Sequence, residues 1–516
     1  MRPKHPFFVG LSCWLCVVLL LTGCMGNGAA SDAAGSRPNI VFVLTDDQDL
    51  LLGSMEYMPQ VNALLTKQGT TFSNFFVNLP LCCPARAMVF TGQYPHNNGI
   101  LTNLWPTGGF PKAYYIGLEE ATLSTALHDV GYRTALFGKY LNGYPLKADP
   151  TYIPPGWDEW WAPITDSAYA SYDYEVNHNG QIERYGRAPQ DYITDVMTQQ
   201  ALAFLGNSSR DHPDTPFFLM FSVYPPHSPA EPAPRHVGLF ADVQAPRTPS
   251  FNEADVSDKA PFMQQAPLLT DEQIAQMDTL YRRRLQSLQS VDEAVAQLVH
   301  ALEANGQLDN TYIVFASDNG FHMGQHRMVS GKGMVYEEDI HVPLIVRGPG
   351  VRQNATRDEL TAIIDLAPTF TELAGAPMAN TVDGRSLLPL LGRGKATGTW
   401  RQMLLLEHYT APSTDETKAL SNGLEPPDPG DLQQATLEQN PPDYMALRTA
   451  RYKYVQRIGT ARELYDMKSD PHELVNRWNE TEPAFQQALA DLIEAYRTCV
   501  GQSCRDLENQ QPPRWP

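Results

Sequence analysis

Apolar runs that alternate with helical segments are the feature that most constrains this 516-residue chain. Residues 39–44 (Asn-Ile-Val-Phe-Val-Leu) form a continuous, β-branched apolar run, which is typical of a strand buried on both faces. Further strands are predicted at 133–137, 217–223, 311–317 and 342–346, and helices at 58–67, 122–130 and 271–305, with Gly69, Gly131 and Gly306 as C-caps. Strands alternating with helices predict an α/β fold with a large, mostly parallel sheet between helices.

The pattern changes near residue 400. Residues 410–444 are rich in Pro, Asp, Glu and Gln, which predicts a long surface loop. Short antiparallel strands are predicted within 445–455 and 461–465, followed by an amphipathic helix at 482–496. We therefore predict a large domain at residues 38–398 and a smaller α+β domain with an antiparallel sheet at 399–516.

The first residues predict export. Arg2 and Lys4 precede an apolar run at residues 7–21, which is too short to span a hydrocarbon core of ~30 Å comfortably. The run ends in Leu-Thr-Gly-Cys24, which resembles the lipobox of bacterial lipoproteins, whose cysteine is lipidated; an ordinary cleaved signal peptide is the alternative. We predict a signal at residues 1–23 and a flexible tether at 24–37. The mature chain is then anchored through Cys24 outside a bacterial membrane, or else secreted or periplasmic.

Charge and cysteine content narrow the functional classes. Asp plus Glu number 58 against 38 Lys plus Arg, a net charge of −20, which argues against a nucleic-acid partner because phosphate contacts need clustered cations. A local cationic pocket can still bind a small anion.

Cys499 and Cys504 are closely spaced and are predicted to form a disulfide in an oxidising compartment. Cys82 and Cys83 are adjacent and cannot easily pair with each other, which points to a special role for one of them.

Polar residues collect where the predicted strands end. In chain order they are Asp46 and Asp47, Lys139, His227, and Asp318 and Asn319. Active sites of open α/β sheets lie beyond the carboxyl ends of the strands, so these side chains are expected to meet. The oxygens of Asp46, Asp47, Asp318 and Asn319 suit Ca²⁺ or Mg²⁺. Taken alone, an Asp-Asp pair is more often a helix cap or a solvated turn.

Residues 81–92 (Leu-Cys-Cys-Pro-Ala-Arg-Ala-Met-Val-Phe-Thr-Gly) place a cysteine at a predicted anion site. Pro84 suits the first position of a helix, which would put Cys82 just before the helix N-terminus, where N–H groups and the helix dipole attract anions. Arg86, one turn further, offers a planar fork for sulfate or phosphate. The residues indicate a nucleophile at an anion site beside a cation; a structural pair of buried thiols is the alternative.

The run Cys-x-Pro-x-Arg with Thr91-Gly92 after it resembles the motif of type I sulfatases, in which a formylglycine-generating enzyme oxidises the first cysteine to Cα-formylglycine. This register selects Cys82 rather than Cys83, and Ala85, where many members have Ser, is a mild departure. Further matches in family order are Asp46-Asp47, Gly138-Lys139, His227, residues 317–320, 331–333, 336–337, 342–343, 463–466 and 470–471. The resemblance implies an alkaline-phosphatase-like sulfatase fold, with residues 38–398 as its catalytic domain.

Within this family the chain is most similar to the N-acetylglucosamine-6-sulfatase and extracellular heparan endosulfatase branch. The likeness is carried by residues 81–84, 94–97, 138–142, 226–229 and 346–350, and by Cys499 and Cys504 with Arg505. Many arylsulfatases have His two residues after the lysine of the Gly-Lys pair, where this chain has Leu141. His322 is the candidate that replaces this histidine in deprotonating or collapsing the formylglycine hydrate.

The resemblance implies a sulfuric ester hydrolase that uses formylglycine and bound Ca²⁺, with Mg²⁺ as the alternative ion, on sulfated sugars such as N-acetylglucosamine 6-sulfate. The implied catalytic residues are Cys82, Arg86, Lys139, His227, Asp318 and Lys332, and the implied metal ligands are Asp46, Asp47, Cys82, Asp318 and Asn319. Asp318 is the expected base, and His227 or Lys332 the expected proton donor to the leaving alkoxide.

Three alternatives remain at this point. They are an arylsulfatase, a phosphonate or phosphate monoester hydrolase of the same superfamily, and a lipid-anchored protein that binds sulfated glycans without turnover. The tryptophan-rich segment at residues 156–162 either stacks on sugar rings or is buried packing.

Overall fold

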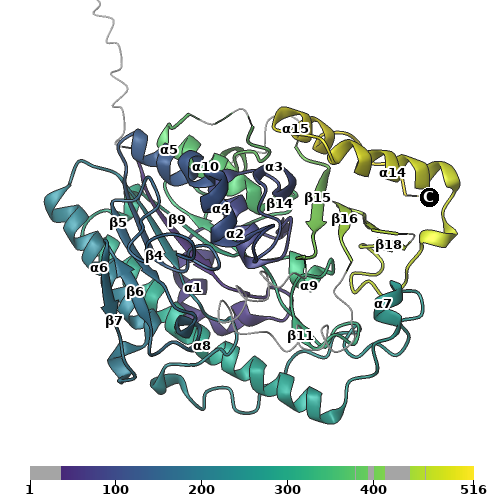
Figure 1. Ribbon diagram of the computed structural model, residues 1–516, viewed down its shortest axis with the longest axis horizontal. Helices are drawn as coiled ribbons and strands as arrows, with labels where there is room; N and C mark the ends of the chain where they lie inside the picture. Colours follow the sequence, from purple (N-terminus) through teal and green to yellow (C-terminus); the bar gives the residue numbers. More distant parts are fainter. Residues whose placement is uncertain are drawn as a thin grey trace, which may run out of the picture. The chain divides into compact units, whose positions relative to one another are not determined.

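A mixed sheet dominates the computed structural model, which describes residues 37–377, 379, 381–392, 400–412, 442–459 and 461–515. Within these residues it has ten strands in the order β13-β2-β12-β9-β1-β8-β4-β5-β6-β7. Figure 1 labels β4–β7 and β9 of this sheet. The inner strands pair in parallel: β9 (Thr311–Ser317), β1 (Asn39–Thr45), β8 (Phe217–Ser222), β4 (Arg133–Gly138) and β5 (Glu159–Pro163). Antiparallel pairing involves β12 (Leu344–Arg347), β6 (Glu175–His178) and β7 (Gln181–Arg184), while β2 (Thr70–Phe72) and β13 (Ala355–Arg357) are parallel to each other.

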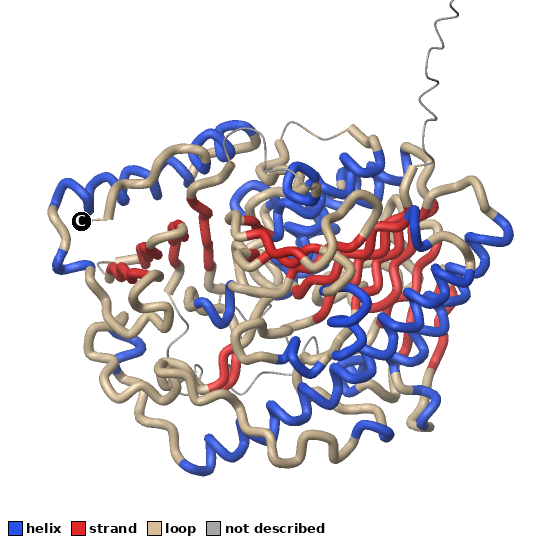
Figure 2. Tube along the Cα trace, turned by 180° about the vertical axis from the view of Figure 1, so that it is seen from behind, coloured by secondary structure: helices blue, strands red, loops and turns tan. Residues whose placement is uncertain are grey.

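Helices cover both faces of this sheet. Ile40, Phe42 and Leu44 of β1 share one core with α2 (Cys82–Thr91), α5 (Leu123–Asp129) and α10 (Leu366–Ala374). Val41 and Val43, which point the other way, share a second core with α6 (Ile193–Asp211) and α8 (Asp271–Ala304). Figure 2 shows the strands between the two helical layers. This two-sided burial is the reason why the β1 sequence is apolar throughout.

A four-stranded antiparallel sheet follows among the described residues, formed by β15 (Met403–His408), β16 (Tyr444–Thr449), β17 (Tyr452–Arg457) and β18 (Arg462–Asp466). It is followed by α14 (Pro483–Tyr496) and α15 (Gln502–Glu508). Leucines of β15 belong to the same core as α2, so the two sheets share apolar packing. The α/β fold with a C-terminal antiparallel sheet is confirmed, whereas the boundary between residues 398 and 399 stays a prediction. The signal, the tether up to residue 36, and residues 413–441 of the predicted loop lie outside the described residues.

The shorter elements connect these layers. The helical ones are η1 (Ser54–Tyr57), α1 (Pro59–Val61), η2 (Asn62–Thr66), α3 (Pro95–Asn98), α4 (Gly109–Ile116), η3 (Leu118–Ala121), η4 (Asp166–Ala170), η5 (Pro189–Asp191), η6 (Pro234–His236), α7 (Pro261–Gln264), η7 (Leu308–Asn310), α9 (Glu337–Ile340), η8 (Ile363–Asp365), α11 (Leu388–Leu391) and η9 (Trp478–Glu480). The short strands are β3 (Phe75–Phe76), β10 (His322–Met323), β11 (Ser330–Gly331) and β14 (Thr361–Ala362).

The helix predicted at residues 58–67 differs from the observed structure. It begins as one turn of α-helix, α1, and continues as the π-helical segment η2. Gly69 is not the predicted left-handed cap: a Cβ on it would lie 2.3 Å from the carbonyl oxygen of Val346, so close backbone approach to β12 requires the glycine. Gly131 and Gly306 do have left-handed φ angles, of 85° and 69°.

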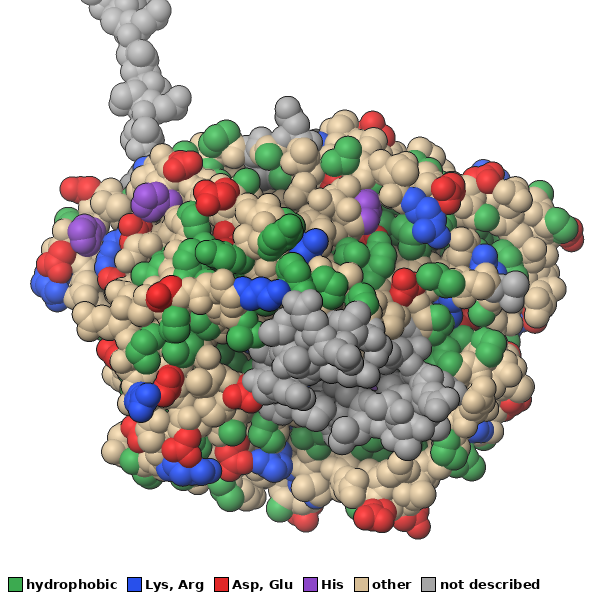
Figure 3. Space-filling model, viewed as in Figure 1, with side chains coloured by type: hydrophobic (Ala, Val, Ile, Leu, Met, Phe, Trp, Pro, Cys, Tyr) green, Lys and Arg blue, Asp and Glu red, His purple; other side chains and the backbone are tan. Residues whose placement is uncertain are grey.

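The described surface agrees with the charge analysis. On the face that Figure 3 shows, Lys and Arg side chains lie scattered among Asp and Glu, and they form no continuous basic stripe in its described part. No helix within the described ranges has the length and apolarity needed to span a bilayer.

Candidate active site

Cys82 is the first residue of α2, and all residues of this helix are buried. The helix therefore begins two residues before Pro84, earlier than predicted, and the extended Leu81 is its N-cap. The Cys82 Sγ atom lies 3.3 Å from Asp46 Oδ1, 3.7 Å from Asp47 Oδ1 and 3.2 Å from Lys332 Nζ. The selected cysteine thus contacts the two acidic residues from the strand-end pattern and Lys332, a residue that the family resemblance implies.

Asp46 and Asp47 directly follow β1, whose neighbour β9 ends in the segment that carries Asp318 and Asn319. The backbone N–H of Asp47 donates to Asp318 Oδ1 at 3.1 Å, and Asn319 Nδ2 donates to Asp47 Oδ1 at 2.7 Å. Asp47 has a φ of 66°, a left-handed conformation that is uncommon for a residue other than glycine. The parallel register of β1 and β9 therefore brings the predicted ligands together at one edge of the sheet.

Two lysines neutralise this acidic pair. Lys139 Nζ lies 2.6 Å from Asp46 Oδ2, and Lys332 Nζ lies 2.9 Å from both carboxylate oxygens of Asp47. Burial by itself would raise the pKa of Asp46, but the charges of Lys139, His227 and Arg86 lower this pKa well below its usual value. Asp46 is therefore ionised at any physiological pH.

Arg86 joins α2 to three other segments. Its Nε donates to Asp318 Oδ2 at 2.8 Å, and its Nη1 donates to the Lys139 carbonyl at 2.9 Å and to Ser222 Oγ at 2.7 Å. Its Nη2 is buried without a hydrogen-bond partner among the described residues and lies 3.9 Å from Asp46 Oδ1. Burial and the charge of Asp46 raise the pKa of Asp318 to about 7, despite the adjacent Arg86.

Ser222 is a site residue that the sequence reasoning missed. It ends β8, pairs in register with Gly138, and also donates to the Lys139 carbonyl at 2.7 Å. The available signal is a hydroxyl residue at the end of an otherwise apolar strand, at the position where the neighbouring strands carry functional side chains.

His227 faces the same cluster. Its Nε2 lies 3.1 Å from Lys332 Nζ and 3.6 Å from Asp47 Oδ2, while its Nδ1 lies 2.7 Å from the Ser228 carbonyl oxygen. His322 Nδ1 pairs with the carboxylate of Asp339 at 2.8 and 3.0 Å. The structure thus places His227 among the ligand candidates, whereas the catalytic role of His322 stays a prediction.

Other side chains considered in the sequence analysis make packing or ion-pair contacts within the fold. Trp160 and Trp161 are fully buried, which favours packing over stacking on sugar rings. Glu337 is held by Arg448 at 2.9 Å and by Lys453 at 3.2 Å, so it braces the contact between α9 and the C-terminal sheet.

The described residues fit a hard cation. Ligand atoms of Asp46, Asp47, Cys82 and His227 all lie within 4.8 Å of one another and are buried. Asn319 Oδ1 is buried and has no hydrogen-bond partner among the described residues, a state that costs free energy unless a cation or other donor satisfies it. Both oxygens of Asp318, in contrast, already accept hydrogen bonds from Asp47 and Arg86. The site therefore offers an acidic cluster that can hold a metal ion.

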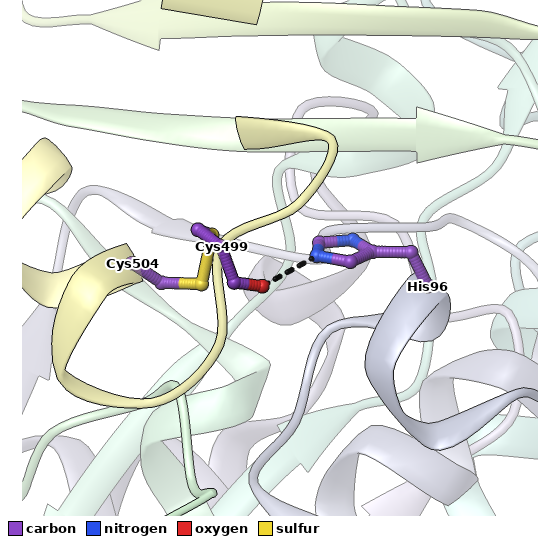
Figure 4. Close-up of side chains that lie close together, drawn as sticks. All are labelled: His96, Cys499 and Cys504. Atoms are coloured by element: carbon purple, nitrogen blue, oxygen red, sulfur yellow. Dashed lines mark hydrogen bonds between the residues drawn. A yellow bond between two sulfur atoms is a disulfide. The ribbon is translucent and has the colours of Figure 1, made fainter. Parts of the chain in front are cut away.

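A second group with ligand-type atoms, His96 with Cys499 and Cys504, has a different role. The two cysteines form a disulfide, which confirms that prediction (Figure 4). His96 Nε2 bonds to the Cys499 carbonyl oxygen at 3.2 Å, and its Nδ1 lies 2.8 Å from Glu407 Oε1. Because its sulfurs are bonded to each other, this group links α3 to the C-terminal segment and is not a metal site.

Comparisons with known proteins show what the whole chain is similar to. The N-acetylglucosamine-6-sulfatase of Homo sapiens is 36% identical over 504 residues, which cover 95% of this chain and 89% of that protein. The chain spans only 53% and 35% of the lengths of the Sulf-1 homologs of Caenorhabditis elegans and Drosophila melanogaster, to which it is 40% and 38% identical. A solved structure of a protein in complex with its substrate D-glucosamine-2-N,6-O-disulfate matches with a TM-score of 0.72 at 25% identity, covering 92% of this chain and 99% of that chain.

The family model described as Sulfatase matches residues 38–376, which include the strand ends, α2 and every residue of the cluster around Cys82. The fold is accordingly the alkaline-phosphatase-like sulfatase fold. The chain belongs to the sulfatase family and is a sulfuric ester hydrolase.

Proposed function

We propose that this sulfatase removes sulfate from sulfated sugars of the N-acetylglucosamine 6-sulfate class, with formylglycine made from Cys82 as its nucleophile and Ca²⁺ as its metal. The observation that carries the proposal is the position of Cys82 Sγ, within 3.7 Å of Asp46, Asp47 and Lys332. The substrate class is supported by the names of the relatives that the chain matches along most of its length.

The proposed ligands of the ion are Asp46, Asp47, Asp318, Asn319 and the side chain at position 82. When bound, the formylglycine hydrate supplies two hydroxyls on one carbon, and the ion supplies a Lewis acid that favours their deprotonation. Charge stabilisation and proton transfer are assigned to residues of the chain itself.

Arg86, Lys139 and Lys332 present positive charge to the sulfuryl oxygens, the kind of electrostatic stabilisation that usually contributes most to catalysis. Asp318 is the proposed base. His227 Nε2 and Lys332 Nζ lie 3.1 Å apart, so either atom can hold the proton that the leaving alkoxide needs.

We further propose that residues 1–23 direct export, that Cys24 carries a lipid anchor and that a formylglycine-generating enzyme acts on Cys82. A relative named an extracellular sulfatase and the disulfide between Cys499 and Cys504 support an oxidising location outside the cytoplasm.

The adjacent cysteines give a matched pair of variants for the test. Cys83 is buried, its N–H donates to Asn103 Oδ1 at 2.9 Å, and burial raises the pKa of its thiol to about 12, so it stays protonated. We expect Cys82→Ala to abolish sulfate release, because no residue replaces the nucleophile, and Cys83→Ala to retain it. Peptide mass spectrometry across residue 82 should show aldehyde oxygen in place of sulfur in the wild type and in Cys83→Ala.

The substrate arm compares N-acetylglucosamine 6-sulfate, the matching 6-phosphate and an aryl sulfate. Faster turnover of the phosphate would favour the phosphohydrolase alternative, and faster turnover of the aryl ester would favour an arylsulfatase. Protein with residue 82 fully converted and Ca²⁺ supplied that leaves all sulfate esters intact would refute the proposal.

A further inference from the structure

Arg284 is an arginine in the apolar stripe of a helix. It lies on α8 and is only 1% exposed. Met277, Tyr281, Leu288 and Val291 on the same helix are buried in apolar clusters, at the spacing of one helical face. A charge in such a stripe is costly unless its hydrogen-bonding groups are used.

The guanidinium of Arg284 contacts the segments that follow three different strands. Its Nη2 donates to the carbonyl oxygen of Asp47, after β1. Its Nη1 donates at 3.1 Å to the carbonyl oxygen of Pro226, the residue before His227, after β8. The guanidinium carbon of Arg284, Cζ, lies 4.0 Å from the ring centre of Phe321, which is two residues after Asn319 and beyond β9. A planar group with several fixed donors can hold such an arrangement, which a lysine cannot reproduce.

Two of these contacts bear on the conformation of the site. Asp47 adopts its left-handed φ of 66°, which costs free energy for a non-glycine residue and persists only where its surroundings hold it. The hydrogen bond from Arg284 holds the carbonyl of this residue. The bond to Pro226 fixes the backbone that carries His227, whose Nε2 must stay near Asp47 and Lys332.

We infer that Arg284 is a positioning residue, which holds Asp47 and His227 in register so that the cluster binds its cation and His227 is aligned with Lys332. It touches neither Cys82 nor the proposed ligand oxygens in any described contact. It acts through the two backbone carbonyls and through a buried ion pair of 3.5 Å with Asp49, two residues after Asp47. The inference rests on the proposed function, because it assigns the geometry of the same site. It follows the general observation that groups behind metal ligands tune affinity by 10- to 100-fold.

The test measures Ca²⁺ binding directly. Wild-type protein with cysteine at position 82, stripped with EDTA and titrated with Ca²⁺ in a calorimeter, gives an affinity that does not depend on turnover. We expect Arg284→Met, which keeps an unbranched apolar stem but removes both hydrogen bonds and the 3.5 Å ion pair with Asp49, to weaken Ca²⁺ binding by at least 10-fold. Arg284→Lys, with a single ammonium group, should have a Ca²⁺ affinity between those of the wild type and Arg284→Met. In enzyme whose residue 82 is converted, we expect Arg284→Met to lower kcat by a larger factor than it raises KM, relative to the wild type.

Arg283→Met is the matched control. Arg283 is the preceding residue on α8, its side chain is 38% exposed, and its described ion pair is with Glu231. We expect it to bind Ca²⁺ like the wild type.

Melting curves with and without Ca²⁺ separate positioning from a merely structural role. A structural role would lower both melting temperatures equally and leave the Ca²⁺ affinity unchanged, which would overturn the inference. A positioning role predicts that Ca²⁺ raises the melting temperature of Arg284→Met by less than it raises that of the wild type. If that variant does not fold, Arg284→Lys with wild-type affinity and kcat would overturn the inference. Wild-type protein that binds no Ca²⁺ would instead refute the proposed metal site.

Discussion

Glu119 is a buried carboxyl group that its surroundings hold close to neutrality. It is 3% exposed and accepts hydrogen bonds from Tyr140 at 2.8 Å and Tyr152 at 3.1 Å. Burial raises its pKa from 4.5 to about 7, because the two hydroxyl donors compensate only part of the desolvation. Tyr140 directly follows Lys139, so this group lies next to the segment that carries a site lysine.

Glu119 predicts a pH-dependent stability. Because its pKa is higher in the folded than in the unfolded chain, its stabilising contribution is complete below pH 4.5 and is lost as pH rises to about 7. Glu119→Gln removes this loss. We expect the free energy of unfolding of the variant, relative to wild type, to rise by about 3 kcal/mol between pH 4.5 and pH 8, at ~1.36 kcal/mol per pKa unit. Denaturant titrations at both pH values measure it, and a constant difference would contradict the prediction.

Single site residues were predictable where chemistry and position coincide. Asp46, Lys139 and Asp318 are polar groups at the ends of apolar runs, and parallel register brings such ends together. Arg284 carries no such signal, because a helix pattern does not show which loops its buried face meets. Ser222 does carry a signal, a hydroxyl at the end of an apolar strand, but the sequence does not show that Arg86 of α2 donates to it.

Among the elements, the segment from α1 to β2 shows how a close backbone approach replaces a helix cap. Gly69 follows η2 and precedes β2, which pairs with β12. Its missing Cβ leaves room for the carbonyl of Val346. The sequence could place a glycine after a helix but could not show that a strand more than 270 residues later needs the space.

Alanine substitutions test this reading of Gly69. We expect Gly69→Ala to destabilise the chain by about 1–3 kcal/mol, since backbone must move to admit the Cβ. Gly206, inside α6 with no atom within 4 Å of its built Cβ, is the control, and Gly206→Ala should stabilise by about 0.5–1 kcal/mol. Equal effects of the two changes, measured by thermal and denaturant unfolding, would rule out the steric explanation.

The predicted elements agree with the structure where periodicity is strong. The central strands and α8 were predicted with shifts of one or two residues, whereas α6, β5–β7 and β15 were missed. The edge strand β7 and its neighbour β6 are short and partly exposed, so they lack the apolar run of a buried strand. β15 precedes the long loop, and residues 409–443 separate it from its partner β16, too long a connection for a hairpin pattern to reveal.

For the whole molecule, a buried ionic network fastens the C-terminal end to the main fold. Glu508, at the end of α15, contacts Arg385 at 2.7 Å and Arg401 at 2.8 Å, and accepts a hydrogen bond from Tyr94. Arg401 also pairs with Asp365, and Glu508, Arg401 and Asp365 have no exposed surface on their side chains. Removing one partner from such a network leaves buried charge without compensation.

Glu508→Gln is therefore expected to lower the free energy of unfolding by about 3–5 kcal/mol. Glu494→Gln is the control, because that side chain is 75% exposed in its pair with Arg497 and such pairs contribute at most about 1 kcal/mol. Similar unfolding midpoints for the two variants would show that α15 is not fastened in this way.

The burial of α2 has a consequence for the timing of the modification that we propose at Cys82. An enzyme must enclose several residues around the thiol it oxidises, yet no residue from Cys82 to Thr91 is accessible once the helix has packed. The conversion that we propose for Cys82 would then take place on the nascent or translocating polypeptide, before tertiary structure forms. Molecules that fold before Cys82 is converted would remain inactive. The specific activity of a preparation would therefore depend on the rate of conversion relative to the rate of folding.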